Sequence, residues 1–170
     1  MGRGSNKEKK NQYQLAREKR QLTRDKASEL LQWLSPERIE RIESEKALPH
    51  PDEVLMMAEG YGEPTLCNYY CSTHCPIGQQ YVPNIQIKEL SQIVLEMLAS
   101  LNSVQRQTER FIEITADGEI ADDEIRDFVM IRKKLERISI TVETLQLWAE
   151  QMVAHGRINA EQYNALMNET

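Results

Sequence analysis

Glycine, proline and β-forming segments are scarce in this sequence. The chain of 170 residues holds only 7 glycines and 6 prolines, which cluster at a few places, so the sequence favours long uninterrupted helices. Runs rich in valine, isoleucine, threonine and aromatic residues, which are typical of strands, are missing. We therefore expect no β-sheet, and the composition predicts an all-α protein.

Long apolar runs are missing as well. No stretch approaches the roughly 20 consecutive apolar residues that span a bilayer, and residues 1–10 are polar and charged, unlike a secretory signal. The three cysteines, an odd number, do not suggest a disulfide framework. These features predict a cytoplasmic protein that has no membrane partner.

The sequence also lacks a catalytic motif. There is no glycine-rich phosphate loop and no nucleophile motif, and His50, His74 and His155 have no evident catalytic partner. We therefore expect that the protein is not an enzyme.

The net charge of −6 is divided unevenly along the chain. Residues 1–50 hold 12 Lys or Arg and 8 Asp or Glu, a net charge of +4, whereas residues 51–170 hold 9 and 19, a net charge of −10. A basic segment on an acidic remainder is compatible with nucleic-acid contact through the basic segment alone. The alternative is a solvated basic tail, and the charge by itself does not decide between the two.

Helix caps and apolar spacing predict five short helices in residues 11–78, behind a disordered basic arm at residues 1–10. Thr23 is a good N-cap for the second helix, whose apolar residues Ala27, Leu30 and Leu31 are expected to be buried. Ser35 followed by Pro36 marks the start of a short third helix. The remaining predicted helices are 12–20, one that Asp52 caps and that runs to Gly60, and 64–74.

A different pattern follows a predicted linker at residues 79–84. Between residues 85 and 170, apolar residues recur in steps of three and four along two segments, which Asp117 and Gly118 separate. A short loop makes two such helices antiparallel, so the sequence predicts a long helical hairpin and then a short C-terminal helix over 160–168. The predicted seam consists of Ile87, Leu90, Val94, Met97, Leu101, Val104, Thr108 and Phe111, and of Phe128, Ile131, Leu135, Ile138, Val142, Leu145, Ala149 and Met152.

The predicted hairpin has more apolar residues than one seam uses. A second apolar edge, formed by Ile93, Leu98, Ile112, Val129 and Trp148, would remain for a partner chain or for the first domain. We therefore expect the hairpin to dimerise the protein or to receive another partner.

Cys67, Cys71 and Cys75 follow one another at intervals of four residues, with His74 beside the last. Positions four apart share one side of a helix, and thiolates at that spacing can hold zinc or an iron–sulfur cluster, whose closed sites need four ligands. His74, His50 or a second chain would have to complete the set. The alternatives are three small thiols that pack in the core, or a redox pair.

Several short motifs between residues 13 and 66 resemble a known family. They are Ala16-Arg17-Glu18-Lys19 and Gln21-Leu22-Thr23-Arg24, then Ser35 with Ile39-Glu40-Arg41-Ile42-Glu43, and Pro49-His50-Pro51 with Val54-Leu55-Met56-Met57-Ala58. Over about a third of the chain, these motifs resemble the XRE family, the Cro and phage-repressor type of helix-turn-helix regulator. The cysteine-bearing stretch from Leu66 to Gly78 resembles an extension of some bacterial members.

The resemblance implies a five-helix, repressor-like helix-turn-helix domain over residues 11–78, whose third helix lies in the major groove of double-stranded DNA. It also implies a transcriptional regulator that acts as a dimer, and a structural ion pair between Arg17 and Glu43. The residues that it places on DNA are Thr23, Arg24, Ser35, Glu37, Arg38, Glu40 and Arg41.

The third helix departs from the family pattern in its charge. Glu37 and Glu40 occupy its exposed face, where phosphates repel carboxylates, although glutamate can accept a hydrogen bond from cytosine N4. Arg38 and Arg41 partly compensate, and one extra residue precedes the helix around residues 32–34. Two alternatives therefore stay open: an interaction adaptor that uses the same fold without DNA, and a metal or redox sensor that acts through the cysteine helix.

Overall fold

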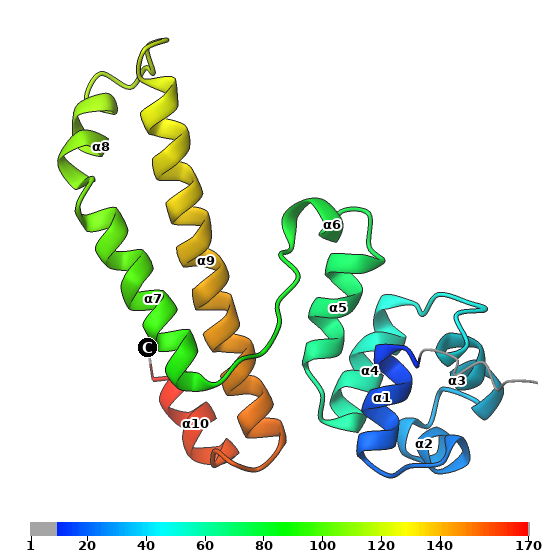
Figure 1. Ribbon diagram of the computed structural model, residues 1–170. Helices are drawn as coiled ribbons and strands as arrows, with labels where there is room; N and C mark the ends of the chain where they lie inside the picture. Colours follow the sequence, from blue (N-terminus) through cyan, green and yellow to red (C-terminus); the bar gives the residue numbers. More distant parts are fainter. Residues whose placement is uncertain (1–9, 170) are drawn as a thin grey trace, which may run out of the picture. The chain divides into compact units, whose positions relative to one another are not determined.

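All regular structure in the described part of the chain is helical. The computed structural model describes residues 10–169, and no strand occurs among them, as the composition predicts. Apart from Lys10, the predicted basic arm lies outside the described residues. The helices are α1 (Gln12–Lys19), α2 (Arg24–Leu31), α3 (Pro36–Glu43), α4 (Pro51–Tyr61), α5 (Thr65–Thr73), α6 (Gly78–Tyr81), α7 (Leu90–Gln105), α8 (Thr108–Ile114), α9 (Ile125–Ala154) and α10 (Ala160–Met167) (Figure 1).

The helices group into two units. The first unit contains the chain up to Asn84 together with the residues from Gln151 onward, and the second unit is Ile85–Glu150. The sequence places residues 151–170 with the hairpin instead, because helical periodicity continues through this segment. No helix in residues 10–169 combines the length and the apolarity that a membrane span requires.

Side-chain caps set the starts of the first three helices. Asn11, Thr23 and Ser35 each accept a hydrogen bond from the backbone N–H three residues further on, at 3.0, 3.2 and 3.2 Å. Thr23 and Ser35 are therefore the N-caps that the sequence predicts. The predicted cap of the fourth helix is wrong: α4 begins at Pro51 with His50 as its N-cap, and the Glu53 carboxylate accepts the His50 backbone N–H at 2.6 Å.

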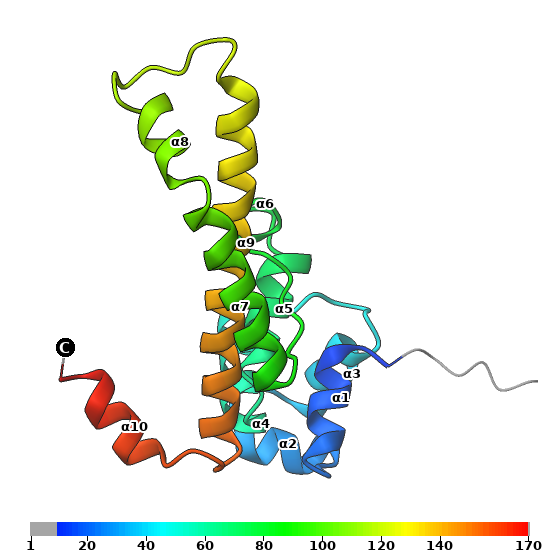
Figure 2. The same cartoon turned by 60° about the vertical axis from the view of Figure 1, so that its left-hand side comes forward.

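The first five helices enclose one apolar core. Helix α1 packs against α3, α4 and α5, and α2 packs against α3 and α4, so both views show them gathered together (Figures 1 and 2). Ala27 and Leu31 lie four residues apart and supply the buried side of α2, whereas Leu30, predicted to be buried, is 47 % exposed because it lies beside that side. The largest fully buried side chains of this core are Tyr13, Tyr61, Ile39, Ile42, Met57 and Val54.

Part of the predicted linker is helical. Helix α6 occupies residues 78–81 and packs against α5, so the irregular connection begins only at Val82. The short turn fits because residue 78 is a glycine: a Cβ atom on Gly78 would overlap the carbonyl oxygen of Cys71 and lie 2.6 Å from its carbonyl carbon. The close approach of α6 to α5 therefore needs glycine at this position.

In the second unit, α7 and α9 lie side by side in both views and run in opposite directions (Figures 1 and 2). The Lys134 ammonium reaches across the pair to the Gln107 side chain at 2.7 Å, and Arg110 Nε lies 2.9 Å from the Asp127 carboxylate. The first long helix is shorter than predicted, because α7 ends at Gln105 and α8 starts at Thr108. No glycine or proline marks this break, and Gln107, which lies in it, is held by Lys134.

The apolar faces of α7 and α9 differ from the prediction. Ile93, assigned to a second exposed edge, is fully buried, and Trp148 is half-buried. Conversely, Val94 and Leu101, assigned to the seam, are exposed by 39 % and 46 %. Helix α10 matches the predicted C-terminal helix but buries none of its side chains, and Leu166 and Met167 are exposed by 58 % and 63 %.

Candidate nucleic-acid interface

Helix α3 has one buried and one exposed side. Ile39 and Ile42 are each 1 % exposed and anchor the helix in the core. Glu37 and Arg41 are exposed, and Glu40 is half-exposed. The helix therefore presents a charged face to solvent while its apolar side holds it in place.

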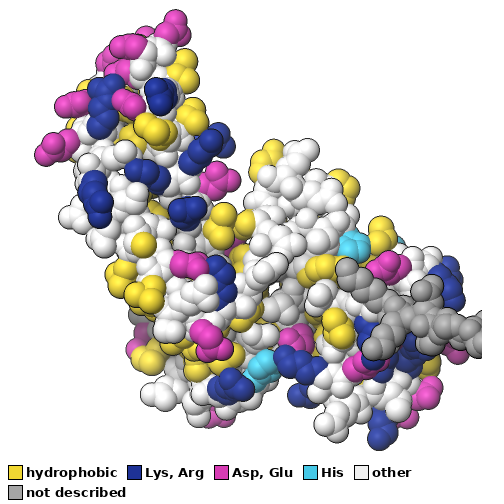
Figure 3. All heavy atoms as spheres, viewed as in Figure 1, with side chains coloured by type: hydrophobic (Ala, Val, Ile, Leu, Met, Phe, Trp, Pro, Cys, Tyr) yellow, Lys and Arg dark blue, Asp and Glu magenta, His cyan; other side chains and the backbone are white. Residues whose placement is uncertain are grey.

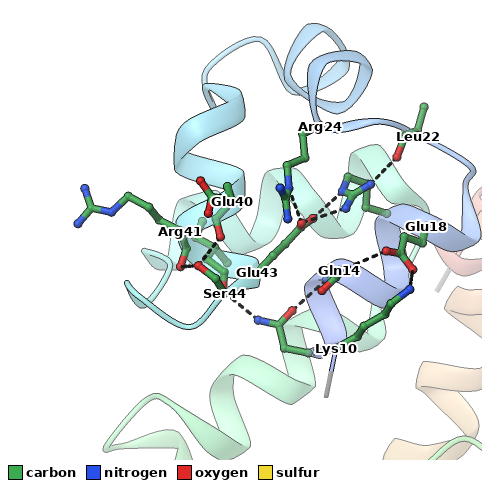
Figure 4. Close-up of polar contacts among 12 residues, drawn as sticks. Lys10, Gln14, Glu18, Leu22, Arg24, Glu40, Arg41, Glu43 and Ser44 are labelled. Atoms are coloured by element: carbon green, nitrogen blue, oxygen red, sulfur yellow. Dashed lines mark hydrogen bonds and ion pairs between the residues drawn. The ribbon is translucent and has the colours of Figure 1, made fainter. Parts of the chain in front are cut away.

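Glu43, at the end of α3, is a buried carboxylate that joins three helices. Its oxygens accept hydrogen bonds from Arg17 Nε at 2.5 Å and Arg17 Nη2 at 2.9 Å, and from Arg24 Nε at 2.9 Å. Arg17 also donates to the Leu22 carbonyl oxygen at 2.5 Å (Figure 4). The hydrogen bond to Glu43 raises the pKa of Arg17 despite burial, so the guanidinium stays charged. The structure thus contains the ion pair that the resemblance implies, and adds Arg24 to it.

Arg38, predicted to face DNA, is held by α4 instead. It donates two parallel hydrogen bonds to Glu53, from Nε at 2.7 Å and from Nη2 at 2.6 Å, and Nη2 also donates to the Leu48 carbonyl oxygen at 3.0 Å. Hydrogen bonding to Glu53 raises the pKa of Arg38. A bidentate pair of this kind fixes the guanidinium plane, so Arg38 stabilises the junction between α3 and α4.

Arg41 is the arginine of α3 that points outward. Its side chain forms no ion pair with any residue in the range 10–169, and Figure 4 shows the guanidinium extending away from the helices. Glu40, one residue earlier, is 3.2 Å from the Lys46 ammonium. Arg41 is therefore the cation of the predicted contact set that is free to bind a phosphate or a base edge.

The remaining predicted contacts on α2 and α3 differ in the hydrogen-bonding groups that they present. The hydroxyl oxygens of Thr23 and Ser35 already accept backbone N–H groups as helix caps. The Thr23 hydroxyl hydrogen remains available, whereas the Ser35 hydroxyl donates to the Glu37 carboxylate. Hydrogen bonds from its own backbone N–H and from Ser35 lower the pKa of Glu37, so this exposed carboxylate is ionised at neutral pH. The face therefore combines Arg41 with the acidic groups of Glu37 and Glu40.

The cysteines are not gathered into a metal site. Cys67, Cys71 and Cys75 are thiols of intermediate burial, and no group of three or more metal-ligating side chains within residues 10–169 is placed to hold an ion. Cys75 Sγ instead accepts the Gly78 backbone N–H at 3.4 Å, and Cys67 packs against the core of the first unit. These contacts fit the packing interpretation of the three thiols.

His74, the fourth predicted ligand, lies among aromatic rings. Its ring centroid is 5.3 Å from that of Tyr69, 6.0 Å from that of Tyr70 and 6.4 Å from that of Tyr13. The Tyr70 ring is stacked on it, at an interplanar angle of 12°, and His74 Nδ1 is 2.5 Å from the Thr73 hydroxyl. The histidine therefore serves packing between α1 and α5.

Glu63 is a second buried carboxylate, and no sequence pattern singles it out. It follows the left-handed Gly62 at the end of α4 and is 6 % exposed. Its carboxylate pairs with the Lys19 ammonium, accepts a hydrogen bond from Gln151 Nε2 at 3.1 Å, and lies 3.1 Å from His155 Nε2. Burial raises the pKa of Glu63, but hydrogen bonds and charge from Lys19 and the other two partners outweigh it and leave the pKa lowered.

This arrangement predicts an acid-dependent loss of stability. Because the pKa of Glu63 is lower in the folded than in the unfolded chain, its contribution is complete above the unfolded value and is lost as the pH falls through the folded value. Glu63→Gln is expected to lower the free energy of unfolding by about 1–2 kcal/mol at pH 7, and its unfolding midpoint should fall less between pH 5 and pH 3 than that of the unchanged protein. Urea unfolding across this range measures both effects. Glu59→Gln, a change at an exposed position of α4, is the matched control, and equal acid sensitivity of all three proteins would refute the prediction.

Sequence reasoning missed the partners of these charges for a common reason. Arg38 pairs with a residue 15 positions away, and Glu63 pairs with residues 44, 88 and 92 positions away. No local sequence pattern links such positions.

Comparisons of the chain with protein-family models, with curated proteins and with solved structures find no match.

Proposed function

We propose that this protein is a DNA-binding transcriptional regulator of the XRE type that acts as a dimer. Residues 11–78 would form its repressor-like helix-turn-helix domain, and the helices that follow would bring two copies together. The proposal rests on the residues that resemble the family and on the chemistry of α2 and α3. It makes the protein a regulator rather than an enzyme, with double-stranded DNA as its main partner.

The observation that carries the proposal is the free guanidinium of Arg41 on the exposed face of α3. The opposite side of the helix is anchored by Ile39 and Ile42, and Glu43 is tied to Arg17 and Arg24. A rigid helix with a projecting arginine suits the major groove, where arginine pairs with the O6 and N7 atoms of guanine. Arg24, whose side chain is 40 % exposed, and the Thr23 hydroxyl are suited to phosphate oxygens.

A second function, an adaptor that binds protein through the same face, also has an observation in its favour. Arg38 and Arg24 hold buried or half-buried carboxylates, while Glu37 and Glu40 remain on the exposed side of α3. These pairings lower the positive charge available for phosphates. The adaptor would use α3 as an acidic surface for a basic partner.

The test compares one arginine of α3 with one elsewhere. Duplexes that the protein enriches from a randomised pool would be labelled, and their affinity measured by fluorescence anisotropy. Arg41→Ala is expected to weaken binding by about 1–3 kcal/mol, because it removes the base-reading guanidinium. Arg132→Ala, an exposed arginine of α9 with no ion pair in the described part of the chain, should bind like the unchanged protein. Equal affinity of both variants would refute the assigned role of Arg41, and the absence of any enrichment by folded protein would favour the adaptor.

A further inference from the structure

The apolar residues of α7 and α9 alternate between buried and exposed positions. In α9, Ile131 is buried and Ile138 is half-buried, whereas Leu135 and Val142, four residues after each of them, are exposed by 41 % and 39 %. Only half of the predicted heptad positions are therefore buried. In these two repeats of α9, one apolar side chain packs between α7 and α9 and the other faces solvent.

Helix α7 repeats the same alternation. Met97 and Val104 are half-buried. Val94 and Leu101, which lie three residues before Met97 and Val104 respectively, are exposed by 39 % and 46 %. Leu98 adds a further exposed residue, at 51 %. Both helices therefore carry an outward apolar row beside their inward one.

The two outward rows lie on the same side of the helix pair. In each helix the outward residues are rotated in the same sense from the inward ones, because a step of four residues advances by 400° and a step of minus three by −300°. In antiparallel helices, equal rotations from the contact line move side chains to one common side. The contacts of Arg110 with Asp127 and of Lys134 Nζ with the Ser103 carbonyl oxygen set the register, which brings Val94 of α7 near the level of Val142 of α9, and Leu101 near the level of Leu135.

This shared apolar side is almost free of charge along α7. Glu96 is the only charged residue among the 16 residues of α7, and Lys88 Nζ donates to both of its carboxylate oxygens at 2.8 Å. Figure 3 shows hydrophobic side chains gathered on the part of the pair that α7 covers, and charged side chains crowded toward its loop end. A surface of this kind is apolar enough to be buried by a partner.

We propose that two copies of this chain associate through the apolar side formed by Val94, Leu98, Leu101, Leu135 and Val142, so that α7 and α9 of each copy form a four-helix bundle. Helices with two apolar rows are typical of such bundles, in which every helix packs against two neighbours. A twofold contact presses the same surface of both copies together, and a row without charge is suited to that arrangement because no like charges meet.

The inference deepens the proposed function, which needs two copies for two half-sites, and it makes a separate prediction about salt. Residues 85–150 hold 8 Lys or Arg and 13 Asp or Glu, a net charge of −5, so two copies repel each other outside the apolar contact. Salt screens that repulsion and leaves apolar contacts intact. Association of the copies should therefore hold or strengthen between about 50 and 500 mM salt, whereas binding to DNA should weaken.

The test measures mass by sedimentation and does not depend on DNA. The unchanged protein is expected to be a dimer, and Leu101→Glu should raise the dissociation constant on the order of 100-fold or more, because it places charges against each other in an apolar contact. Val129→Glu is the matched control: Val129 is 40 % exposed, and its place two residues before Ile131 puts it on the far side of α9. Circular dichroism checks that both variants are folded.

Three outcomes would overturn the inference. In the first, the unchanged protein stays monomeric up to about 100 μM, well above the dissociation constant of a specific dimer. In the second, Leu101→Glu leaves the dimer intact. In the third, Val129→Glu disrupts the dimer as much as Leu101→Glu does. A monomer that still binds DNA would remove the bundle and keep the proposed function. A dimer that does not bind DNA would keep the bundle and remove the regulator.

Discussion

Replacing Glu43 by alanine is expected to lower the free energy of unfolding by about 3–5 kcal/mol, the cost of leaving buried charges without their partner. The Glu43 side chain is 2 % exposed and the Arg17 side chain 8 %. Removing the carboxylate leaves the Arg17 guanidinium inside the first unit without a counter-charge, and also releases Arg24 from α3. Urea unfolding followed by circular dichroism measures the change.

The control for this prediction removes the charge on both sides. In the double variant Arg17→Met and Glu43→Leu, no buried charge is left unpaired, so most of the lost stability should return. If Glu43→Ala costs less than about 1 kcal/mol, the value of a surface ion pair, the carboxylate does not hold α1, α2 and α3 together.

Replacing Gly78 by alanine is expected to lower the free energy of unfolding by about 1–3 kcal/mol, the typical cost of overpacking. The new Cβ would overlap the Cys71 carbonyl oxygen and lie 2.9 Å from its Cα atom. Backbone atoms inside a helix cannot move aside as a flexible side chain can, so α6 would have to separate from α5. The thermal unfolding midpoint reports the loss of stability.

A local readout supports this measurement. Separation of α6 removes the backbone N–H that Cys75 Sγ accepts and uncovers Cys71, so both thiols should react faster with an alkylating reagent. Gln80→Ala, a change at an exposed position of α6, should alter neither the stability nor the thiol reactivity. Unchanged stability and reactivity in Gly78→Ala would show that the close approach of the two helices is dispensable.

Features that depend on adjacent residues could be predicted from the sequence. Ser35 and Pro36 define the start of α3 because a serine cap and a proline at the first helical position act within one turn, and Thr23 does the same for α2. The all-α class followed from the scarcity of strand-forming segments. Asp52 shows the limit of this reasoning, since His50 and Asp52 flank the same proline and only the packing of the turn selects His50.

Periodicity gave the apolar rows of α7 and α9, but not what each row faces. A heptad pattern predicts that a helix has apolar partners; it does not give their number or the chain that supplies them. The periodicity therefore does not distinguish the exposed Val94 and Leu101 from the inward Met97. The break after Gln105 was also missed, because it contains neither glycine nor proline.

The candidate site was predictable as a set of residues and not as a set of roles. The motifs placed Arg24, Arg38 and Arg41 together on two neighbouring helices, but their sequence neighbours do not reveal which cations are neutralised. Glu53 accepts hydrogen bonds from Arg38, and Glu43 accepts hydrogen bonds from both Arg17 and Arg24. The structure leaves Arg41 as the free arginine of α3, which is the reason why the proposed recognition depends on it.

The most direct test of the proposed regulator is the affinity of the unchanged protein for its selected duplex at about 50 and about 200 mM salt, the range over which phosphate contacts lose much of their strength. If α2 and α3 lie on DNA, the affinity should fall at least ~10-fold between the two concentrations, because released counterions set the binding energy. Folded, dimeric protein that binds no DNA at the lower concentration would contradict the account and direct the search to a basic protein partner for the acidic face of α3.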